Sequence, residues 1–258
     1  MRSAIFAAVA CAGCFDWESL SPEAACTRPA GAPDVAADYV IHVLPPGAVI
    51  TDSSTCSEPF WPSVPEIRLE TANTTNNASL SCRMVWDPAR TSGAQDVVHG
   101  CCAAADTDLE ATRVPAIRDQ DVYLDDSFEY YLTLHPNRRD DTTTKVAINI
   151  LASVWDADFA GGDFNPSYDA GVVARAATDG QTVNDPAMPD TGYTIKWQAN
   201  VGFRVPAPHV AGCAFMMSDN DAGAERALWN AYGAGRNDIN DEAKWGRCLF
   251  SCTPPPQP

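Results

Sequence analysis

One stretch near the middle of the sequence combines residue types that bind polar, ring-shaped molecules. Residues 119–132 read Asp-Gln-Asp-Val-Tyr-Leu-Asp-Asp-Ser-Phe-Glu-Tyr-Tyr-Leu. In an extended strand, alternate residues such as Glu129 and Tyr131 present a fixed polar row on one face. A carboxylate accepts paired hydrogen bonds from neighbouring hydroxyl groups, and an aromatic ring covers the apolar C–H face of a pyranose. Rings and carboxylates at this spacing could therefore bind a ligand that has hydroxyl groups and an apolar face.

Sequence motifs for catalysis are missing. The chain has no G-x-S-x-G, no H-E-x-x-H, no phosphate loop and no G-x-G-x-x-G. Its four histidines are scattered, and a lone histidine on a strand is more often structural than catalytic. Acidic residues are so abundant that a carboxylate pair for glycoside hydrolysis could be drawn from almost any two loops. We therefore expect a protein that is not an enzyme.

Two acidic turns could hold a metal ion. The spacings Asp156-x-Asp158-x4-Asp163 and Asp219-Asn-Asp221 place oxygen ligands on turns. Oxygen ligands suit Ca²⁺ better than softer metals. Solvated acidic turns are the commoner explanation of such a pattern, so both interpretations remain open.

The balance of charge excludes one class of partner. Lys and Arg total 17 against 34 Asp and Glu, which gives a net charge of -17. Such a surface repels phosphate backbones and anionic membranes. We therefore expect no nucleic-acid partner and membrane contact only through a lipid anchor. The 258 residues fit one large domain, which we expect to be a monomer.

The N-terminus has the pattern of an export signal. Met1-Arg2-Ser3 supplies a positive charge, residues 4–12 are apolar, and Cys11-Ala-Gly-Cys14 places small residues before a cysteine. Cys14 after Ala-Gly resembles the lipobox of bacterial lipoproteins and would be the lipidated first residue of the mature chain. Cys11, after Val9-Ala10, is a second possible acceptor. An ordinary signal peptide that contains cysteines is the alternative. We expect a lipid-anchored protein of the bacterial cell envelope.

The composition divides the chain into four parts. After the signal, residues rich in Pro, Ala and Ser suit a flexible tether, and the chain ends on a proline-rich tail. The expected division is a signal peptide at 1–13, a tether at 14–33, a folded domain at 34–252 and a tail at 253–258.

The cysteines agree with export. Eight of the ten follow Cys14, and an oxidising compartment pairs an even number: Cys26, Cys56, Cys82, Cys101, Cys102, Cys213, Cys248 and Cys252. Their spacing lacks the C-x2-C knuckles of structural zinc sites. We therefore expect disulfides.

One disulfide can be placed. Strands at Leu80–Trp86 and Val97–Ala105 would form a hairpin whose register sets Cys82 opposite Cys101. Adjacent cysteines point to opposite faces, so Cys82 is expected to pair with either Cys101 or Cys102.

The elements that must position these residues are strands. Residues 128–134 and 193–201 alternate apolar and polar side chains, which predicts half-buried strands. Only Ala222–Tyr232 has a helix-like pattern. The fold class predicted is all-β, an antiparallel, jelly-roll-like β-sandwich stabilised by disulfides. About ten short strands are expected, at Tyr39–Leu44, Glu66–Glu70, Leu80–Trp86, Val97–Ala105, Phe128–Leu134, Lys145–Val154, Gly171–Ala176, Tyr193–Val201, Cys213–Ser218 and Trp245–Phe250.

Several short motifs together resemble family 9 carbohydrate-binding modules and the related DOMON sandwiches. Residues 119–132 are similar to the family signature D-x-x-W-x-D-D-S-V-E-x-F-L, and residues 49–61 occupy the place of an opening I-D-G-x-x-D-x-x-W. Further similarities follow in the family's order at residues 82–87, 102–106, 192–197, 217–221 and 244–247. The resemblance covers roughly residues 34–250 and implies a sugar-binding β-sandwich.

The resemblance also implies site residues. In the family, two tryptophans sandwich a terminal sugar. The first corresponds to Tyr123, which keeps a ring, and the acid of the signature corresponds to Glu129. The second falls near Ile239, which has no ring, and an arginine contact falls at about Ala147.

Nearby residues could supply the missing contacts. Trp229 or Tyr232 could provide the second ring, with Asn237 or Arg236 as a polar partner. The alternative is that Tyr123 and Trp229 are ordinary packing residues.

The resemblance bears on cofactors as well. Calcium is reported for the family, which supports the interpretation of the acidic turns as calcium ligands. Haem, bound by some relatives through Met and His, would need a pair such as Met216 or Met217 with His99. No organic cofactor is expected.

We therefore predict an exported module that binds an oligosaccharide or polysaccharide without cleaving it. A structural or interaction lipoprotein that has lost sugar binding is the first alternative. A haem-binding electron-transfer domain is the second.

Overall fold

The computed structural model describes residues 36–70, 78–88, 95–179, 183–185, 190–220, 225–229 and 241–256. The expected signal segment, the tether, Cys14 and Asn237 lie outside these residues. The side chain of Trp229 also lies outside them, although its backbone belongs to a strand.

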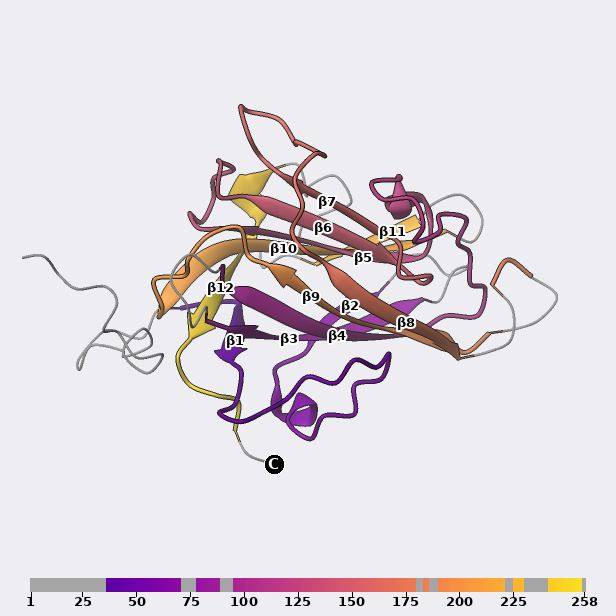
Figure 1. Ribbon diagram of the computed structural model, residues 1–258, viewed down its shortest axis with the longest axis horizontal. Helices are drawn as coiled ribbons and strands as arrows, with labels where there is room; N and C mark the ends of the chain where they lie inside the picture. Colours follow the sequence, from indigo (N-terminus) through magenta and orange to yellow (C-terminus); the bar gives the residue numbers. More distant parts are fainter. Residues whose placement is uncertain are drawn as a thin grey trace, which may run out of the picture.

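The described chain is built from β-strands and single turns of 3-10 helix (Figure 1). The helical turns are η3 (Trp61–Ser63), η4 (Val122–Leu124) and η6 (Glu242–Lys244). The strands are β1 (Tyr39–Val43), β2 (Ile67–Glu70), β3 (Ser79–Asp87), β4 (Val97–Ala105), β5 (Ser127–Thr133), β6 (Thr144–Asn149), β7 (Val154–Asp158), β8 (Val173–Asp179), β9 (Gly192–Asn200), β10 (His209–Asp219), β11 (Glu225–Trp229) and β12 (Gly246–Ser251).

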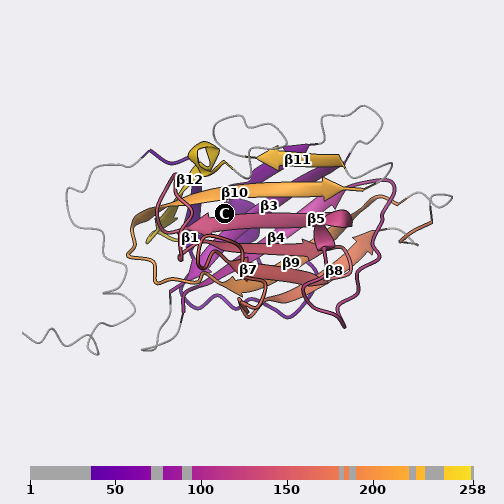
Figure 2. The same cartoon turned by 90° about the horizontal axis from the view of Figure 1, so that it is seen from above.

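All of these strands belong to one curled sheet. Their order is β7-β6-β5-β10-β12-β1-β3-β4-β9-β8, with β11 added to β10 and β2 added to β3. The sheet curls back on itself (Figure 2). Its two end strands, β7 and β8, both contribute residues to the lining of one cavity. The all-β prediction is thus confirmed. The expected sandwich of two separate sheets is not confirmed, because continuous pairing through β12 and β1 makes the sheet nearly closed and barrel-like.

The strand pairing is antiparallel with one exception. β1 runs parallel to both of its neighbours, β12 and β3. It therefore joins the two ends of the described chain, since Tyr39 lies opposite Cys248. No local pattern in the sequence could reveal a pairing between residues so far apart.

Aromatic side chains fill the inside of the curled sheet. Tyr130 of β5 stacks on Trp197 of β9 with ring centroids 4.7 Å apart, and so connects two walls of the barrel. Gly100 of β4 lies against the same tryptophan, and a Cβ atom there would overlap the indole ring. The core therefore depends on a glycine at this position.

Strand β5 is buried on both faces, whereas its alternation predicted a half-buried strand. Phe128 and Tyr130 belong to the main core. On the other face, Tyr131 packs against Trp245 with centroids 5.4 Å apart. The chain leading into β12 thus covers the outside of β5 and the adjacent residue Ala214 of β10.

Two predicted elements differ in the structure. The single strand expected at Lys145–Val154 is the hairpin of β6 and β7, with a turn between Asn149 and Val154. The helix-like segment Ala222–Tyr232 contains β11 instead, because residues 225–229 pair with the end of β10. Tertiary pairing overrides the weak helical pattern there.

Three disulfides stabilise the described sheet: Cys56–Cys101, Cys82–Cys102 and Cys213–Cys248. Of the two partners expected for Cys82, the structure joins it to Cys102. The expected register was wrong by one residue, because Cys82 lies opposite Cys102. The neighbouring Cys101 points to the other face, where it holds the segment that precedes β2. Cys252 is disulfide-bonded as well.

Among the described residues, no helix has the length and apolar character needed to cross a membrane.

Candidate functional site

Four side chains from successive elements gather on the outer face of the barrel. Tyr123 lies on η4, Glu129 on β5, Lys145 on β6 and Trp155 on β7. The register sets Glu129 opposite Ala147, and Ala147 opposite Trp155. Because side chains alternate along each strand, these residues share one face. We call them the Lys145 cluster.

Lys145 is the centre of this cluster. Its Nζ lies 2.8 Å from Oε2 of Glu129. The same nitrogen lies 4.5 Å from the ring centroid of Trp155, 5.2 Å from that of Tyr131 and 5.7 Å from that of Tyr123. All three distances are within the range of cation–π attraction. One ammonium group is therefore held by a carboxylate and surrounded by three rings.

The electrostatics keep this lysine charged. Burial lowers the pKa of Lys145, but the negative charge of Glu129 and the phenol of Tyr131 raise it by more, so the pKa lies above its ordinary value. The Glu129 side chain has no exposed surface. Its second oxygen, Oε1, has no hydrogen-bond partner among the described residues. The site therefore contains a charged pair with one unused acceptor.

The arrangement decides what a ligand meets first. Tyr123, Lys145 and Trp155 are partly exposed, whereas Glu129 is fully buried. A ligand that approaches from solvent would contact the two rings and the ammonium group. Glu129 would influence such a ligand only indirectly, because it holds the Lys145 ammonium group in place.

The structure brings together two of the four predicted sugar contacts. Tyr123 and Glu129 both belong to the Lys145 cluster. The backbone of Trp229 lies opposite Phe215, at the far side of β10 from β5. Asn237 lies outside the described residues. Ala147, which stands where the family has an arginine, is a small residue that lies between Glu129 and Trp155 in the register.

Sequence reasoning missed Lys145 and Trp155 as site residues. Lys145 was taken only as the start of a strand, and Trp155 lay one residue beyond its predicted end. A turn signal was available, since the Asn149 side chain accepts hydrogen bonds from the backbone N–H of Leu151 and Ser153. A turn at Asn149 would have placed Trp155 beside Ala147.

A second cluster is made of acids. Asp106 follows β4, Asp126 precedes β5 and Asp219 ends β10, and one oxygen from each lies within 4.8 Å of the others. Burial, followed by the charge of Asp106, raises the pKa of Asp126 to about 9. Burial, together with the charge of Asp219, raises the pKa of Asp106 to about 6. The geometry offers three oxygen ligands to a hard cation such as Ca²⁺.

The calcium ligands predicted from the turns are placed differently. Asp156 is buried and bound by Arg118 and the Ala170 N–H, whereas Asp163 is exposed and caps the Phe164 N–H. Asp158 is half-buried in β7. Within the described residues, only the triad of Asp106, Asp126 and Asp219 brings three acidic groups so close. The structure therefore does not bring Asp156, Asp158 and Asp163 together at one point, and of the described turn acids only Asp219 belongs to the triad.

The residues considered for haem are also separated. His99 lies on β4 beside Lys196 and Glu58, and burial lowers its pKa. Met216 lies opposite Glu129 on β10. Strands β12, β1 and β3 separate β10 from β4, so the structure does not bring this pair together.

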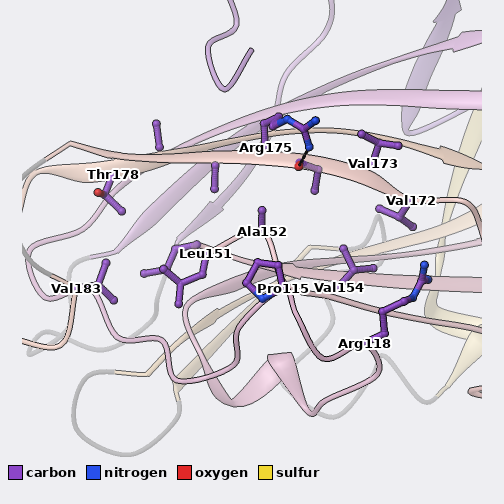
Figure 3. Close-up of a pocket in the computed structure, with 14 residues that line it drawn as sticks. Pro115, Arg118, Leu151, Ala152, Val154, Val172, Val173, Arg175, Thr178 and Val183 are labelled. Carbon is purple, nitrogen blue, oxygen red and sulfur yellow. Dashed lines mark hydrogen bonds between the residues drawn. The ribbon is translucent and has the colours of Figure 1, made fainter. Parts of the chain in front are cut away.

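One sizeable cavity lies away from both clusters. It has a volume of about 770 Å³ and lies between β8 and the β6–β7 hairpin (Figure 3). Its lining is mostly aliphatic, and apart from Arg118, Arg175 and Thr178 it lacks polar side chains. Because sugar sites combine rings with hydrogen-bonding groups, we assign the candidate site to the Lys145 cluster.

Comparison with known proteins gives a fold but no sequence relative. No family model and no curated protein matches the chain. A family 9 carbohydrate-binding module from Caldicellulosiruptor kristjanssonii, solved with cellotriose, matches with a TM-score of 0.54 and 13% identity over 83% of this chain and 93% of that chain. The chain has the fold of family 9 carbohydrate-binding modules.

Two further structures are similar to this chain. A family 9 module from the same organism, solved with glucose, matches with a TM-score of 0.52 and 16% identity over 82% of this chain and 95% of that chain. A proposed carbohydrate-binding protein from Bacteroides uniformis matches with a TM-score of 0.56 and 13% identity over 83% and 99% of the two chains. The resemblance inferred from the motifs is thus confirmed for the fold.

Proposed function

We propose that this protein binds carbohydrate without cleaving it, and that the Lys145 cluster is the binding site. The observation that carries the proposal is the pair of partly exposed rings, Tyr123 and Trp155, around Lys145, which is ion-paired with the buried Glu129. The family 9 fold supports it, because structures with this fold include complexes with cellotriose and glucose.

The chemistry of the cluster suits a neutral sugar. The rings of Trp155 and Tyr123 offer apolar faces to the C–H groups of a pyranose. Lys145 has three N–H donors, and those not used by Glu129 can donate to sugar hydroxyls. Because Glu129 neutralises this charge and the chain carries a net charge of -17, an anionic glycan gains little from Lys145.

Titration calorimetry with glucose and cellotriose, preceded by a glycan array, tests the proposal. The wild type should bind at least one glycan, and Trp155→Ala should weaken that binding. Lys145→Gln should weaken that binding as well. Lys244→Gln is its control, since Lys244 is an exposed lysine on η6. If the folded wild type retains no glycan, the protein is a structural or interaction lipoprotein instead.

We also propose that Asp106, Asp126 and Asp219 bind Ca²⁺. Three buried carboxylates at this distance repel one another when ionised, and a divalent cation would remove that repulsion. Asp126 directly precedes β5, which carries Glu129, so the ion would hold one end of the strand that supports the sugar site.

Export and lipid anchoring complete the proposal. They rest on the order of charge, apolar run and small residues before Cys14. The variant Cys14→Ser should leave the membrane fraction with its fold unchanged. Continued membrane partition of Cys14→Ser combined with Cys11→Ser would contradict the anchor.

A further inference from the structure

The aliphatic groove between β8 and the β6–β7 hairpin has no role in the proposed sugar site. Figure 3 shows Leu151, Ala152 and Val154 on one side of this groove and Val173 and Thr178 on the other. The volume of about 770 Å³ is within the range of sites that hold a ligand or a segment of chain.

Exposed apolar side chains gather around the same groove. Among the described residues, four large hydrophobic side chains are strongly exposed, and three of them are Val114, Ile117 and Val173, at 43%, 58% and 42%. Val173 lines the groove, Val114 precedes the lining residue Pro115, and Ile117 precedes the lining residue Arg118. The fourth, Val49, lies elsewhere in the chain. Such a concentration marks a surface that another group covers.

The groove also exposes an unpaired strand edge. Of the described strands, β8 pairs with β9 alone. Two hydrogen bonds show which residues face each edge of β8. The Asp179 carbonyl accepts from the Thr191 N–H, so it faces β9. The Ala174 carbonyl accepts from the Arg175 guanidinium, so it faces the open edge. Because successive residues direct their backbone groups to opposite edges, the open edge presents the N–H and C=O groups of every second residue: Ala174, Ala176 and Thr178.

The size of the side chains indicates what could fit beside this edge. Ala174 and Ala176 pack toward the main core and are small, and Ala152 lies across the groove from β8. Small residues on both sides leave room for large side chains of an added strand. An extended peptide that pairs with an edge and places alternate side chains in a groove is a known mode of recognition.

A segment of this chain has the complementary pattern. Residues 15–20 read Phe-Asp-Trp-Glu-Ser-Leu. In an extended conformation, Phe15 and Trp17 would point to one face and Asp16 and Glu18 to the other. The rings could fill the groove, and the acids would lie on the outer face, where Arg175 is half exposed beside Asp52.

The segment is long enough to reach. Fifteen residues lie between Leu20 and Ala36, the first described residue, and this stretch spans up to about 55 Å. A domain of this size has a diameter of roughly 45 Å. We propose that residues 15–20 dock in this groove as an added strand on the open edge of β8.

Hydrogen exchange of the β8 amides tests this proposal in the otherwise complete chain carrying Cys14→Ser. The amides of Ala174, Ala176 and Thr178 should exchange at least about tenfold faster after Phe15→Ser and Trp17→Ser are introduced together. Ser19→Ala is the matched control and should change nothing. A synthetic peptide of residues 15–20 should restore protection to a chain that lacks them, and a scrambled peptide should not.

Two outcomes would overturn the proposal. Equal exchange in all variants would show that residues 15–20 do not cover β8. Protection that depends on protein concentration and survives the double substitution would assign the groove to a second copy of the chain. Val173→Glu, at the exposed rim, provides an independent check, since it should weaken peptide binding without removing a core side chain.

Discussion

Lys145 covers Glu129: the lysine Nζ lies 2.8 Å from a carboxylate oxygen of a side chain that has no exposed surface. The pair therefore has two roles that experiments can separate. It stabilises the outer face of β5 and β6, and it presents an ammonium group between the rings of Tyr123 and Trp155.

A double-mutant cycle should reveal the structural role. Lys145→Met leaves the Glu129 charge buried without its partner, which should cost about 3 to 5 kcal/mol of unfolding free energy. Glu129→Gln should also destabilise the domain. The double variant should recover most of the loss, because neither charge then remains unpaired. Urea unfolding measures all three, and additive losses would contradict a coupled pair.

The rings should matter for binding more than for stability. Trp155 and Tyr123 are partly exposed, so Trp155→Ala and Tyr123→Ala should each weaken glycan binding by about 1 to 3 kcal/mol, borrowing the magnitude for stacking of bases on aromatic side chains. That is roughly a 5- to 150-fold change in Kd. Calorimetry measures the affinity for the glycan. Thermal unfolding is the control, because it shows whether each variant keeps its stability. Unchanged affinity with a lowered Tm would make these rings packing residues.

The part of the site that sequence could predict is the part encoded locally. Tyr123 and Glu129 belong to one continuous stretch, so their proximity follows from a single turn and strand. Trp155 reaches the same face only because the chain reverses between Asn149 and Val154. Lys145 pairs with Glu129 only because β6 lies beside β5. Both facts depend on strand pairing, which alternation alone does not specify.

The fold shows the same limit. Alternating residues correctly indicated strands such as β5 and β9, because each pattern is contained in the strand itself. Closure of the sheet depends on β1, whose parallel pairing with β12 and β3 joins distant segments. The triad of Asp106, Asp126 and Asp219 likewise comes from three separate connections. Spacing in the sequence pointed to neighbouring acids instead.

The glycine of β4 gives a test of the core. At Gly100 an added methyl group would overlap the ring of Trp197, which is itself stacked on Tyr130. Gly100→Ala should therefore destabilise the domain by about 1 to 3 kcal/mol or more, as overpacking does. Urea unfolding measures the loss. Gly47→Ala is a control for a glycine without neighbours within 4 Å, although its positive φ adds a strain of its own.

The acidic triad predicts a dependence of stability on pH in calcium-free protein. An unfolded aspartate titrates near 3.9, whereas the folded pKa values of Asp106 and Asp126 are raised to about 6 and about 9. Between these values the folded state binds more protons than the unfolded state. The contribution of these two acids to stability should thus be greatest at and below about pH 4 and should fall as the pH rises toward 9, by up to about 1.4 kcal/mol per pH unit for each proton.

Replacing Asp126, the acid with the larger pKa shift, should remove most of this dependence. Asp126→Asn cannot ionise, so in EDTA its Tm should exceed that of the wild type at pH 8 and approach it at pH 4. Added Ca²⁺ should reverse the order of the two Tm values at pH 8. The cation stabilises the ionised carboxylates of the wild type, whereas the variant offers it one ligand fewer. Thermal unfolding at both pH values, with and without Ca²⁺, measures this. If Ca²⁺ raises the Tm of both proteins equally, the ion binds elsewhere and the triad is a structural cluster of protonated acids.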